Sequence, residues 1–292
     1  MSLLASPTFR RLAGKLPFKP FRNLPPVVPV VRLAGVIAGV STPLGTRVIN
    51  LATLAPQLEH AFSAAGAAAV ALAINSPGGS PVQSALLHTR IRELAAEKKL
   101  PVFAFAEDVA ASGGYWLALA GDEIFADQTS IVGSIGVISA GFGFSDLLAR
   151  IGVERRLHTE GTRKSLLDPF RPEKPEDIER LRRLQQEIHQ RFIELVRERR
   201  GAKLKDPEAN GVFEGEIFTG QGALEIGLID GIGHLRTVMR ARFGDKVQLR
   251  GFGAPRSWLR RRLGLAEARG GDWAEGLLAA AEKRAVWERY GL

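Results

Sequence analysis

Apolar stretches of strand length recur in the first half of the chain, and two of them are followed by paired glycines and a helix-like pattern. The run 68–74 is apolar throughout, as expected for a strand that is covered on both faces. Residues 102–105 form a second strand-like run, and Val27–Ile37 is predicted as the first strand. The pattern therefore predicts a repeated strand–Gly-Gly–helix layout, and two such turns at one sheet edge would form a site.

The first of these turns joins the strand at 68–74 to a helix. Ser80 is predicted as the N-cap, Pro81 as the first helical position and Gln83 as the third residue of a capping box. Apolar residues follow on one helical face, at Leu87, Ile91, Leu94 and Ala95. The backbone N–H groups of Gly78 and Gly79 are then free to face a ligand oxygen, although an ordinary tight turn would account for two glycines equally well.

The second turn carries a lone serine, Ser112, which precedes the apolar helical run 115–120. A side chain at this junction lies at the positive end of the helix dipole, which lowers the cost of developing negative charge. Gly113 and Gly114 lack a Cβ, so a second backbone is able to approach closely. Two interpretations follow: Ser112 is a nucleophile beside an oxyanion site, or it is an N-cap followed by small residues packed on a neighbouring element.

A nucleophilic serine needs a base, and the histidines are poorly placed to supply one. None of the five histidines lies between residues 113 and 157, and His158 has only Glu160 as an acidic neighbour. The same region offers Lys164. A lysine acts as a general base when it is neutral, which requires burial or a neighbouring cation to lower its pKa from roughly 10.4. The alternative for Lys164 is an ordinary exposed lysine in a charged loop.

Five blocks of sequence resemble the signal peptide peptidase A (protease IV) family in order and spacing. They are Asn75–Gly79, Ala110–Trp116, Gly133–Val137, Gly161–Ser165 and Phe218–Gly233. The resemblance implies that Ser112 is the nucleophile and that Lys164 of the same chain is the general base. It further implies that Gly78 or Gly79, together with Gly113, supplies the backbone donors of an oxyanion hole.

The same resemblance implies a fold and a domain organisation. The family has an α/β fold of the Clp protease/crotonase type, in which repeated ββα turns stack into a spiral that usually assembles into rings. We expect a basic N-terminal segment at 1–25, the peptidase domain at 26–245 and a C-terminal helical extension at 246–292. A long amphipathic helix is predicted at 175–200, with most of its apolar stripe packed in the core of one subunit. The stretch 258–292 could cap the domain, bridge subunits or lie on a membrane.

Composition excludes several other kinds of chemistry. The chain has no cysteine, which excludes a disulfide framework, a thiol nucleophile and a cysteine-ligated metal. It has no glycine-rich phosphate loop followed by a lysine, so nothing indicates a nucleotide-driven enzyme. The histidines are scattered and not paired at ligand spacing. We therefore expect neither a metal site nor any other cofactor.

The positive charge of the chain is concentrated in two places. The formal net charge is +9; residues 1–22 hold five basic residues and no acid, and residues 231–262 hold nine basic residues and one acid. Such stretches could contact an anionic membrane at about 1 kcal/mol per basic residue, or form an ordinary solvated surface. No specific nucleic-acid motif is present. The first 22 residues contain no unbroken apolar run of signal-peptide length, and no apolar run in the sequence is long enough for a spanning helix. We expect a cytoplasmic protein, with peripheral contact at the cytoplasmic face of the inner membrane as a further expectation.

The function expected from these residues is that of a serine endopeptidase with a Ser–Lys dyad. By resemblance, its substrates are signal peptides or other short, unfolded, membrane-derived peptides, and its assembly is a homo-oligomeric ring. Trp116 and Ile135 are expected as apolar walls of the substrate pocket, and Ser165 as a hydroxyl that orients Lys164. Two alternatives remain open: a crotonase-type enzyme that acts on acyl thioesters with the same oxyanion loops, and a non-catalytic scaffold that binds peptides.

Overall fold

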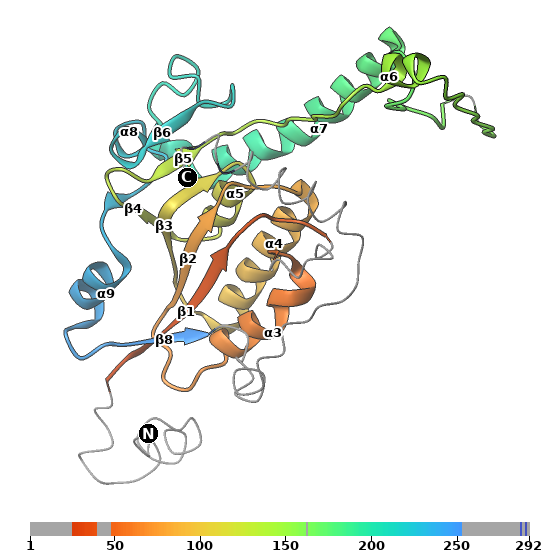
Figure 1. Cartoon of the computed structure of the whole chain (residues 1–292). Helices are drawn as coiled ribbons and strands as arrows, with labels where there is room; N and C mark the ends of the chain where they lie inside the picture. Colours follow the sequence, from red (N-terminus) through yellow and green to blue (C-terminus); the bar gives the residue numbers. More distant parts are fainter. Residues whose placement is uncertain (1–24, 40–47, 162, 253–286, 288–289, 291–292) are drawn as a thin grey trace. The chain divides into compact units, whose positions relative to one another are not determined.

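The computed structural model describes residues 25–39, 48–161, 163–252, 287 and 290 (Figure 1). The chain divides into two compact units. The first contains the residues up to Ile135 and those from Leu195 onward, and the second contains Gly136–Glu194. Almost all of the basic segment expected at 1–25, and most of the extension expected at 246–292, lie outside the described residues.

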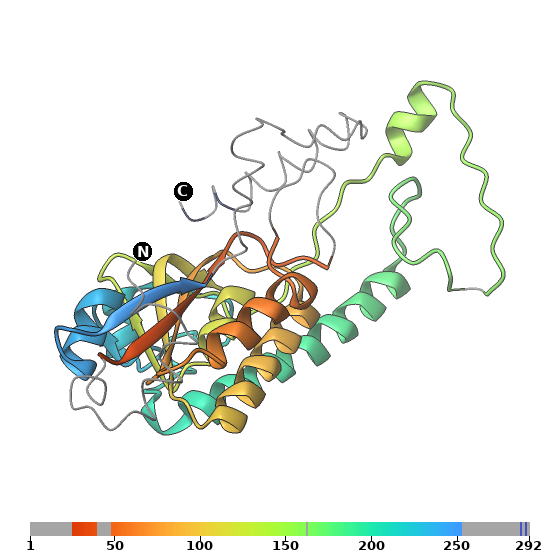
Figure 2. The same cartoon turned by 90° about the horizontal axis from the view of Figure 1, so that it is seen from below.

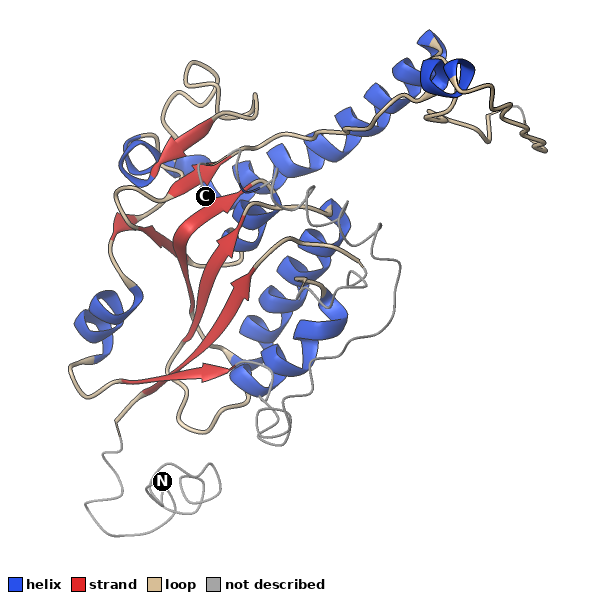
Figure 3. Ribbon diagram, in the orientation of Figure 1, coloured by secondary structure: helices blue, strands red, loops and turns tan. Residues whose placement is uncertain are grey.

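The first unit is built on a single sheet of eight strands within the described residues. The strands are β1 (Val27–Ala34), β2 (Val70–Ser76), β3 (Val102–Ala111), β4 (Glu123–Ala126), β5 (Ile131–Gly133), β6 (Ile217–Thr219), β7 (Gly231–Ile232) and β8 (Gln248–Phe252). Their main order is β6-β5-β3-β2-β1-β8, while β4 pairs with both β3 and β7. All pairs are parallel except β5 with β6. The red arrows of Figure 3 show this sheet.

Helices cover the sheet between its parallel strands, as parallel connections require. In the first unit they are α3 (Leu51–Phe62), α4 (Pro81–Lys98), α5 (Gly113–Ala118), α8 (Gly220–Glu225) and α9 (Leu235–Phe243). Helices α3 and α4 pack side by side (Figure 2), and α5 packs against α4, β2 and β3. The α9 helix packs on the other face of the sheet, where its Met239 joins Val28, Ala71 and Phe103 in an apolar cluster.

The α/β class predicted by resemblance is confirmed, and the alternation of parallel strands with helices is consistent with the Clp protease/crotonase type. The α4 helix begins as the sequence predicts, because the Ser80 side chain accepts a hydrogen bond from the Gln83 amide and Pro81 is the first helical residue. The first strand is shorter than predicted. It ends at Ala34, and Ile37 forms only isolated bridges, to Ile49 and Gly79.

The second unit contains α6 (Ser145–Arg150) and most of the long helix α7 (Pro175–Arg200), whose bounds agree with the prediction from the sequence. The predicted burial of its apolar stripe differs from the structure. Phe192 is buried, whereas Leu184 is 50% exposed. Near its C-terminal end, α7 enters the first unit, where Val196 is fully buried. The stripe therefore contributes to the core of the first unit only at this end.

Candidate active site

Ser112 lies at the junction of β3 and α5, in a backbone conformation that serine rarely adopts. Its φ is 52° and its ψ is −122°, which is costly for a residue with a Cβ and is typical of functional turns. The Ser112 amide donates to the Gly133 carbonyl (2.8 Å), which ties the turn to β5. The Ser112 side chain makes no capping hydrogen bond to α5. The interpretation of Ser112 as a conventional N-cap is therefore not supported.

The turn at Gly78-Gly79 lies directly against Ser112. A Cβ built on Gly78 would lie 2.8 Å from the Ser112 Cβ and 2.8 Å from the Gly113 amide nitrogen, and Gly78 has a φ of +102°. Only a residue without a side chain fits there without displacing the serine. A Cβ on Gly114 would likewise overlap the Ser76 carbonyl. The two strand–Gly-Gly–helix turns thus meet at one sheet edge, as their shared pattern predicts.

The three glycines of the predicted oxyanion hole differ in how their amides are used. The Gly78 amide donates to the Ser76 hydroxyl (3.2 Å). Gly113 is the first residue of α5, a position at which the amide has no partner within its own helix. The residues on either side of Gly79 both pair with Ile37: the Gly78 carbonyl accepts from the Ile37 amide, and the Ser80 amide donates to the Ile37 carbonyl. Neither of these two bonds uses the Gly79 amide. The local geometry therefore favours the amides of Gly79 and Gly113 as donors to a ligand.

Polar side chains beneath these turns were not singled out from the sequence. Asn75 donates to the Asp108 carboxylate and accepts from the Val109 amide (3.3 Å), at the point where the register between β2 and β3 shifts. Ser84, on α4, is fully buried and donates to the Ser80 carbonyl (3.0 Å). These bonds fix the strand end and the helix start on either side of the Gly78-Gly79 turn. Asn75 belongs to the first motif, but its hydrogen-bond partner Asp108 lies 33 positions further along the chain, so the motif by itself does not predict the bond.

The last motif of the resemblance, Phe218–Gly233, is hydrogen-bonded to α5. The Tyr115 hydroxyl is buried and donates to the Leu228 carbonyl (2.7 Å). Asp230 accepts from Arg200 (2.7 Å), Lys203 (2.5 Å) and the Ile124 amide (2.8 Å). Burial alone would raise the pKa of Asp230, but the hydrogen bonds from the two cations outweigh it and lower that pKa.

Three basic side chains bind the carbonyl groups that follow α5. Arg199 donates to the carbonyls of Leu119 (2.9 Å) and Gly121 (2.8 Å), and Arg92 donates to that of Ala120 (3.0 Å). His88 is hydrogen-bonded to the Leu119 backbone. Burial, with the nearby Arg199 charge, lowers the pKa of His88 to about 4. These contacts satisfy the carbonyl groups at the end of the helix that begins at the serine.

Comparison with known proteins places this arrangement in a family. The sequence profile of peptidase family S49 matches residues 94–248, just over half of the chain. This chain belongs to peptidase family S49. The match includes Ser112, Lys164 and the last motif, and the Gly78-Gly79 turn precedes it.

Individual relatives of this S49 chain carry different names. A protein named as the Na(+)/H(+) antiporter NhaA of Brucella abortus is 52% identical over 93% of the chain and 38% of that protein. The chloroplastic serine protease SPPA of Arabidopsis thaliana is 34% identical over 71% of the chain and 31% of that protein. Protease 4 of Haemophilus influenzae is 34% identical over 62% of the chain and 29% of that protein. The chain thus spans less than two fifths of the length of each of these relatives.

The remaining predicted residues of the S49 site lie in both units. Trp116 and Ile135 are buried in the first unit. Lys164 and Ser165 lie in a turn of the second unit, where the Lys164 amide donates to the Gly161 carbonyl (3.1 Å). Lys164 is exposed and Ser165 is half-buried. The predicted nucleophile and the predicted base therefore belong to different units.

Two searches of the described residues concern metals and membranes. No group of three or more histidine, aspartate or glutamate side chains in this part of the chain is arranged to hold a metal ion. Within the same ranges, no helix is both long and apolar enough to cross a membrane.

Proposed function

We propose that this S49 protein is a serine endopeptidase in which Ser112 is the nucleophile and Lys164 the general base. The observation that carries the proposal is the strained backbone of Ser112, held directly against the glycine turn at Gly78-Gly79. Strain of this kind is retained where the surrounding structure overdetermines it, and it is common at active sites. The resemblance of the Gly161–Ser165 block to the same peptidase family supports the choice of Lys164 as base.

The proposed mechanism follows from these groups. Ser112 Oγ attacks the carbonyl carbon of the scissile peptide bond while neutral Lys164 Nζ accepts the hydroxyl proton. The amides of Gly79 and Gly113 bind the oxyanion, a contribution of roughly 2.7–4 kcal/mol per donor in well-studied proteases. The C–N bond then breaks, and Lys164 passes the proton to the leaving amine. Water attacks the acyl-enzyme with Lys164 as base again, which releases the acid and restores Ser112.

The proposed substrates are signal peptides or other short, unfolded, membrane-derived peptides. This proposal rests on the family resemblance and on the apolar side chains next to the nucleophile, which include Trp116. A crotonase-type enzyme would use the same oxyanion turns without a covalent serine intermediate, and a scaffold would not need the strain at Ser112. The serine's backbone strain favours the peptidase.

A homo-oligomer is proposed for the assembly. Large apolar side chains are exposed in the second unit, including Ile138 (70%), Phe142 (69%) and Ile151 (60%), and exposed apolar patches mark interaction surfaces. Sedimentation velocity tests this: the native chain should sediment as an oligomer, and the double substitution Ile138→Lys and Phe142→Lys should shift it toward the monomer. A native chain that sediments as a monomer at micromolar concentration would contradict the proposal.

Peripheral contact with an anionic membrane is proposed from the basic stretches at 1–22 and 231–262. Co-sedimentation with vesicles tests it. Binding to vesicles that contain phosphatidylserine, lost in high salt and absent with neutral vesicles, is the expected result. Equal recovery with both kinds of vesicle would show that charge does not direct the protein to membranes.

Peptide hydrolysis by the Ser112→Ala variant tests the catalytic proposal. The substitution removes one hydroxyl from a turn whose backbone bonds remain, so the circular dichroism spectrum should be unchanged. The kcat/KM for an unfolded signal-peptide substrate should fall at least about 10³-fold. The matched control is Ser63→Ala, at an exposed serine after α3, which should retain full activity. A Ser112→Ala protein that retained wild-type turnover would overturn the assignment.

A further inference from the structure

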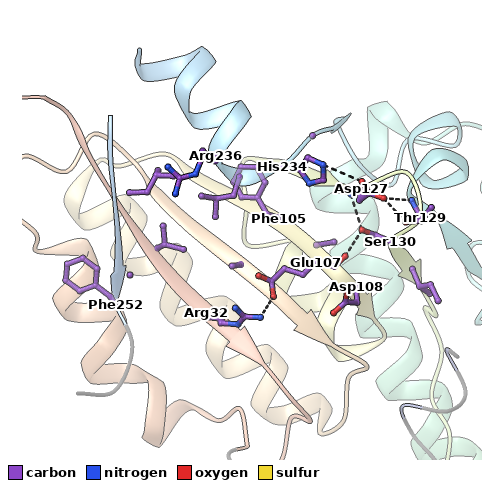
Figure 4. Close-up of a pocket in the computed structure, with 18 of the residues that line it drawn as sticks. Arg32, Phe105, Glu107, Asp108, Asp127, Thr129, Ser130, His234, Arg236 and Phe252 are labelled. Carbon is purple, nitrogen blue, oxygen red and sulfur yellow. Dashed lines mark hydrogen bonds and ion pairs between the residues drawn. The ribbon is translucent and has the colours of Figure 1, made fainter. Parts of the chain in front are cut away.

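A large cavity lies on the face of the sheet that carries α9. Its volume is about 1420 Å³, and its floor is formed by small or apolar residues of neighbouring strands, among them Val30, Ala73, Phe105 and Leu249. Figure 4 shows the labelled lining residues, which come from β1, β3, β8, the loop between β4 and β5, and the start of α9. Pockets for small ligands usually measure about 300–1000 Å³. The space thus suits a segment of polypeptide better than a metabolite.

The position of the cavity shows that the described helices cover this face of the sheet incompletely. The α9 helix packs over the part of this face that holds Val28, Ala71 and Phe103. The cavity occupies the same face further along the strands, where Val30 and Ala73 follow at the same side-chain period. An apolar sheet face must pack against another layer to be stable in water. The described helices leave this part of the face without such a layer.

The rim of the cavity is polar, and most of its charges are already paired. Arg32 forms an ion pair with Glu107 (2.7 Å), and His234 lies 3.5 Å from Asp127. The Asp108 carboxylate accepts from Asn75. Arg236, at the start of α9, is exposed at the rim. An apolar floor with a largely neutralised rim favours an apolar occupant over a highly charged ligand.

Two described residues from the C-terminal part of the chain lie at this cavity. Phe252, the last residue of β8, lines it, and so does Tyr290, two residues before the end of the chain. The Tyr290 amide donates to the Trp287 carbonyl (2.9 Å). The segment from 253 to 292 also contains three of the four tryptophans of the chain, at 258, 273 and 287. The chain therefore leaves the sheet at the cavity, returns to it, and carries large apolar side chains between those points.

We propose that the C-terminal segment 253–292 is the occupant of this cavity and forms the missing layer on this face of the sheet. Burial of large apolar side chains is favourable in water, and the tryptophans and leucines of the segment supply such side chains for docking. The proposal concerns the architecture of the first unit and does not depend on the catalytic assignment.

Photo-crosslinking from the cavity rim in the chain of 292 residues tests this docking. Because the native chain has no cysteine, Arg236→Cys can carry a maleimide–benzophenone group as its single label. The matched control is Val82→Cys on α4, where residue 82 is 65% exposed on a helix that covers the other face. After irradiation, crosslinked peptides are identified by mass spectrometry, and gel mobility separates crosslinks within a chain from those between chains.

The expected result is a crosslink within one chain from residue 236 to the segment 253–292, at least tenfold more abundant than from residue 82. A second measurement uses Ala73→Cys in the cavity floor. Its thiol should react slowly in the native background and at least tenfold faster when Trp287→Asp and Tyr290→Asp are added. Crosslinks mainly to a second copy, equal yields from both positions, or a residue 73 thiol that reacts at the same rate in both backgrounds would overturn the proposal.

Discussion

At the scale of single residues, the site depends on backbone shape at three positions. Ser112 holds a left-handed φ that costs on the order of 1–3 kcal/mol for a residue with a side chain. Gly78 lets the neighbouring turn approach the serine, and Gly114 lets α5 approach the end of β2. The hydroxyl of Ser112 is therefore presented beside backbone amides instead of being used to cap its helix.

Replacing Gly78 by alanine should damage catalysis more than stability. The new Cβ would lie 2.8 Å from the Ser112 Cβ, and the φ of +102° disfavours alanine, so either the turn or the serine must move. A displacement of about 1 Å at a reacting group costs about 10²-fold in rate, and kcat should fall by at least that factor. Gly201→Ala is the matched control, because a Cβ there meets no atom within 4 Å. A Gly78→Ala enzyme with normal kcat would show that this turn does not position the reaction.

The assignment of Lys164 as base predicts a specific response to its replacement. Lys164→Arg should be as damaging to kcat/KM as Lys164→Ala, because a guanidinium stays protonated and cannot accept the serine proton. His158→Gln is the control for a histidine base and should leave kcat/KM unchanged. An active Lys164→Arg enzyme, or a His158→Gln enzyme that has lost its activity, would contradict the assignment.

At the scale of elements, the α5 helix is held at both ends. Its start carries the serine, and the carbonyls that follow it bind Arg199, Arg92 and His88. His88 is the titrating member of this group. Its pKa of about 4 in the folded state is below its ordinary value of 6.5, so the unfolded chain binds more protons between these values. Stability therefore falls as the pH drops from about 6.5 toward 4.

The substitution His88→Gln should make the protein less sensitive to acid. Between pH 7 and pH 5, the shifted pKa of His88 accounts for a loss of about 2 kcal/mol in the free energy of unfolding. Glutamine keeps an N–H donor for the Leu119 carbonyl but does not titrate in this range. Urea denaturation at the two pH values measures the difference, with His60→Gln, at an exposed histidine, as the control. An equal loss in the native and His88→Gln proteins would refute this account.

Patterns of residues close together in the sequence predicted the helices and strands around the site better than they predicted the hydrogen bonds between those elements. The start of α4 follows from Ser80, Pro81 and Gln83, which act within four residues of one another. The register shift held by Asn75 and Asp108 joins positions on different strands, and no periodicity marks such a pair. The oxyanion donors, Lys164 and the pocket residues stay predictions, because their roles depend on a substrate.

At the scale of the whole molecule, the polar and apolar pattern did not predict where the sheet ends or how the chain divides into two units. The sheet extends to Phe252, beyond residue 245, because β8 pairs with β1 across more than 200 residues of sequence. The predicted stripe of α7 spans both units, since the helix continues past Glu194 into the first. An amphipathic pattern identifies the face of a helix but not the unit that the face packs against. Long-range pairing of this kind is what local periodicity leaves undetermined.

Covalent trapping of the nucleophile tests the central claim most directly. The chain of 292 residues is treated with a peptidyl fluorophosphonate, and the adduct is mapped by mass spectrometry. Ser134→Ala is the control, because Ser134 follows the neighbouring strand β5 and has a similar backbone φ of 53°. The account predicts one adduct, on Ser112, that is retained in Ser134→Ala and lost in Ser112→Ala. An adduct on another residue, or an active enzyme that never labels at Ser112, would contradict the assignment of this chain as a serine peptidase with Ser112 as its nucleophile.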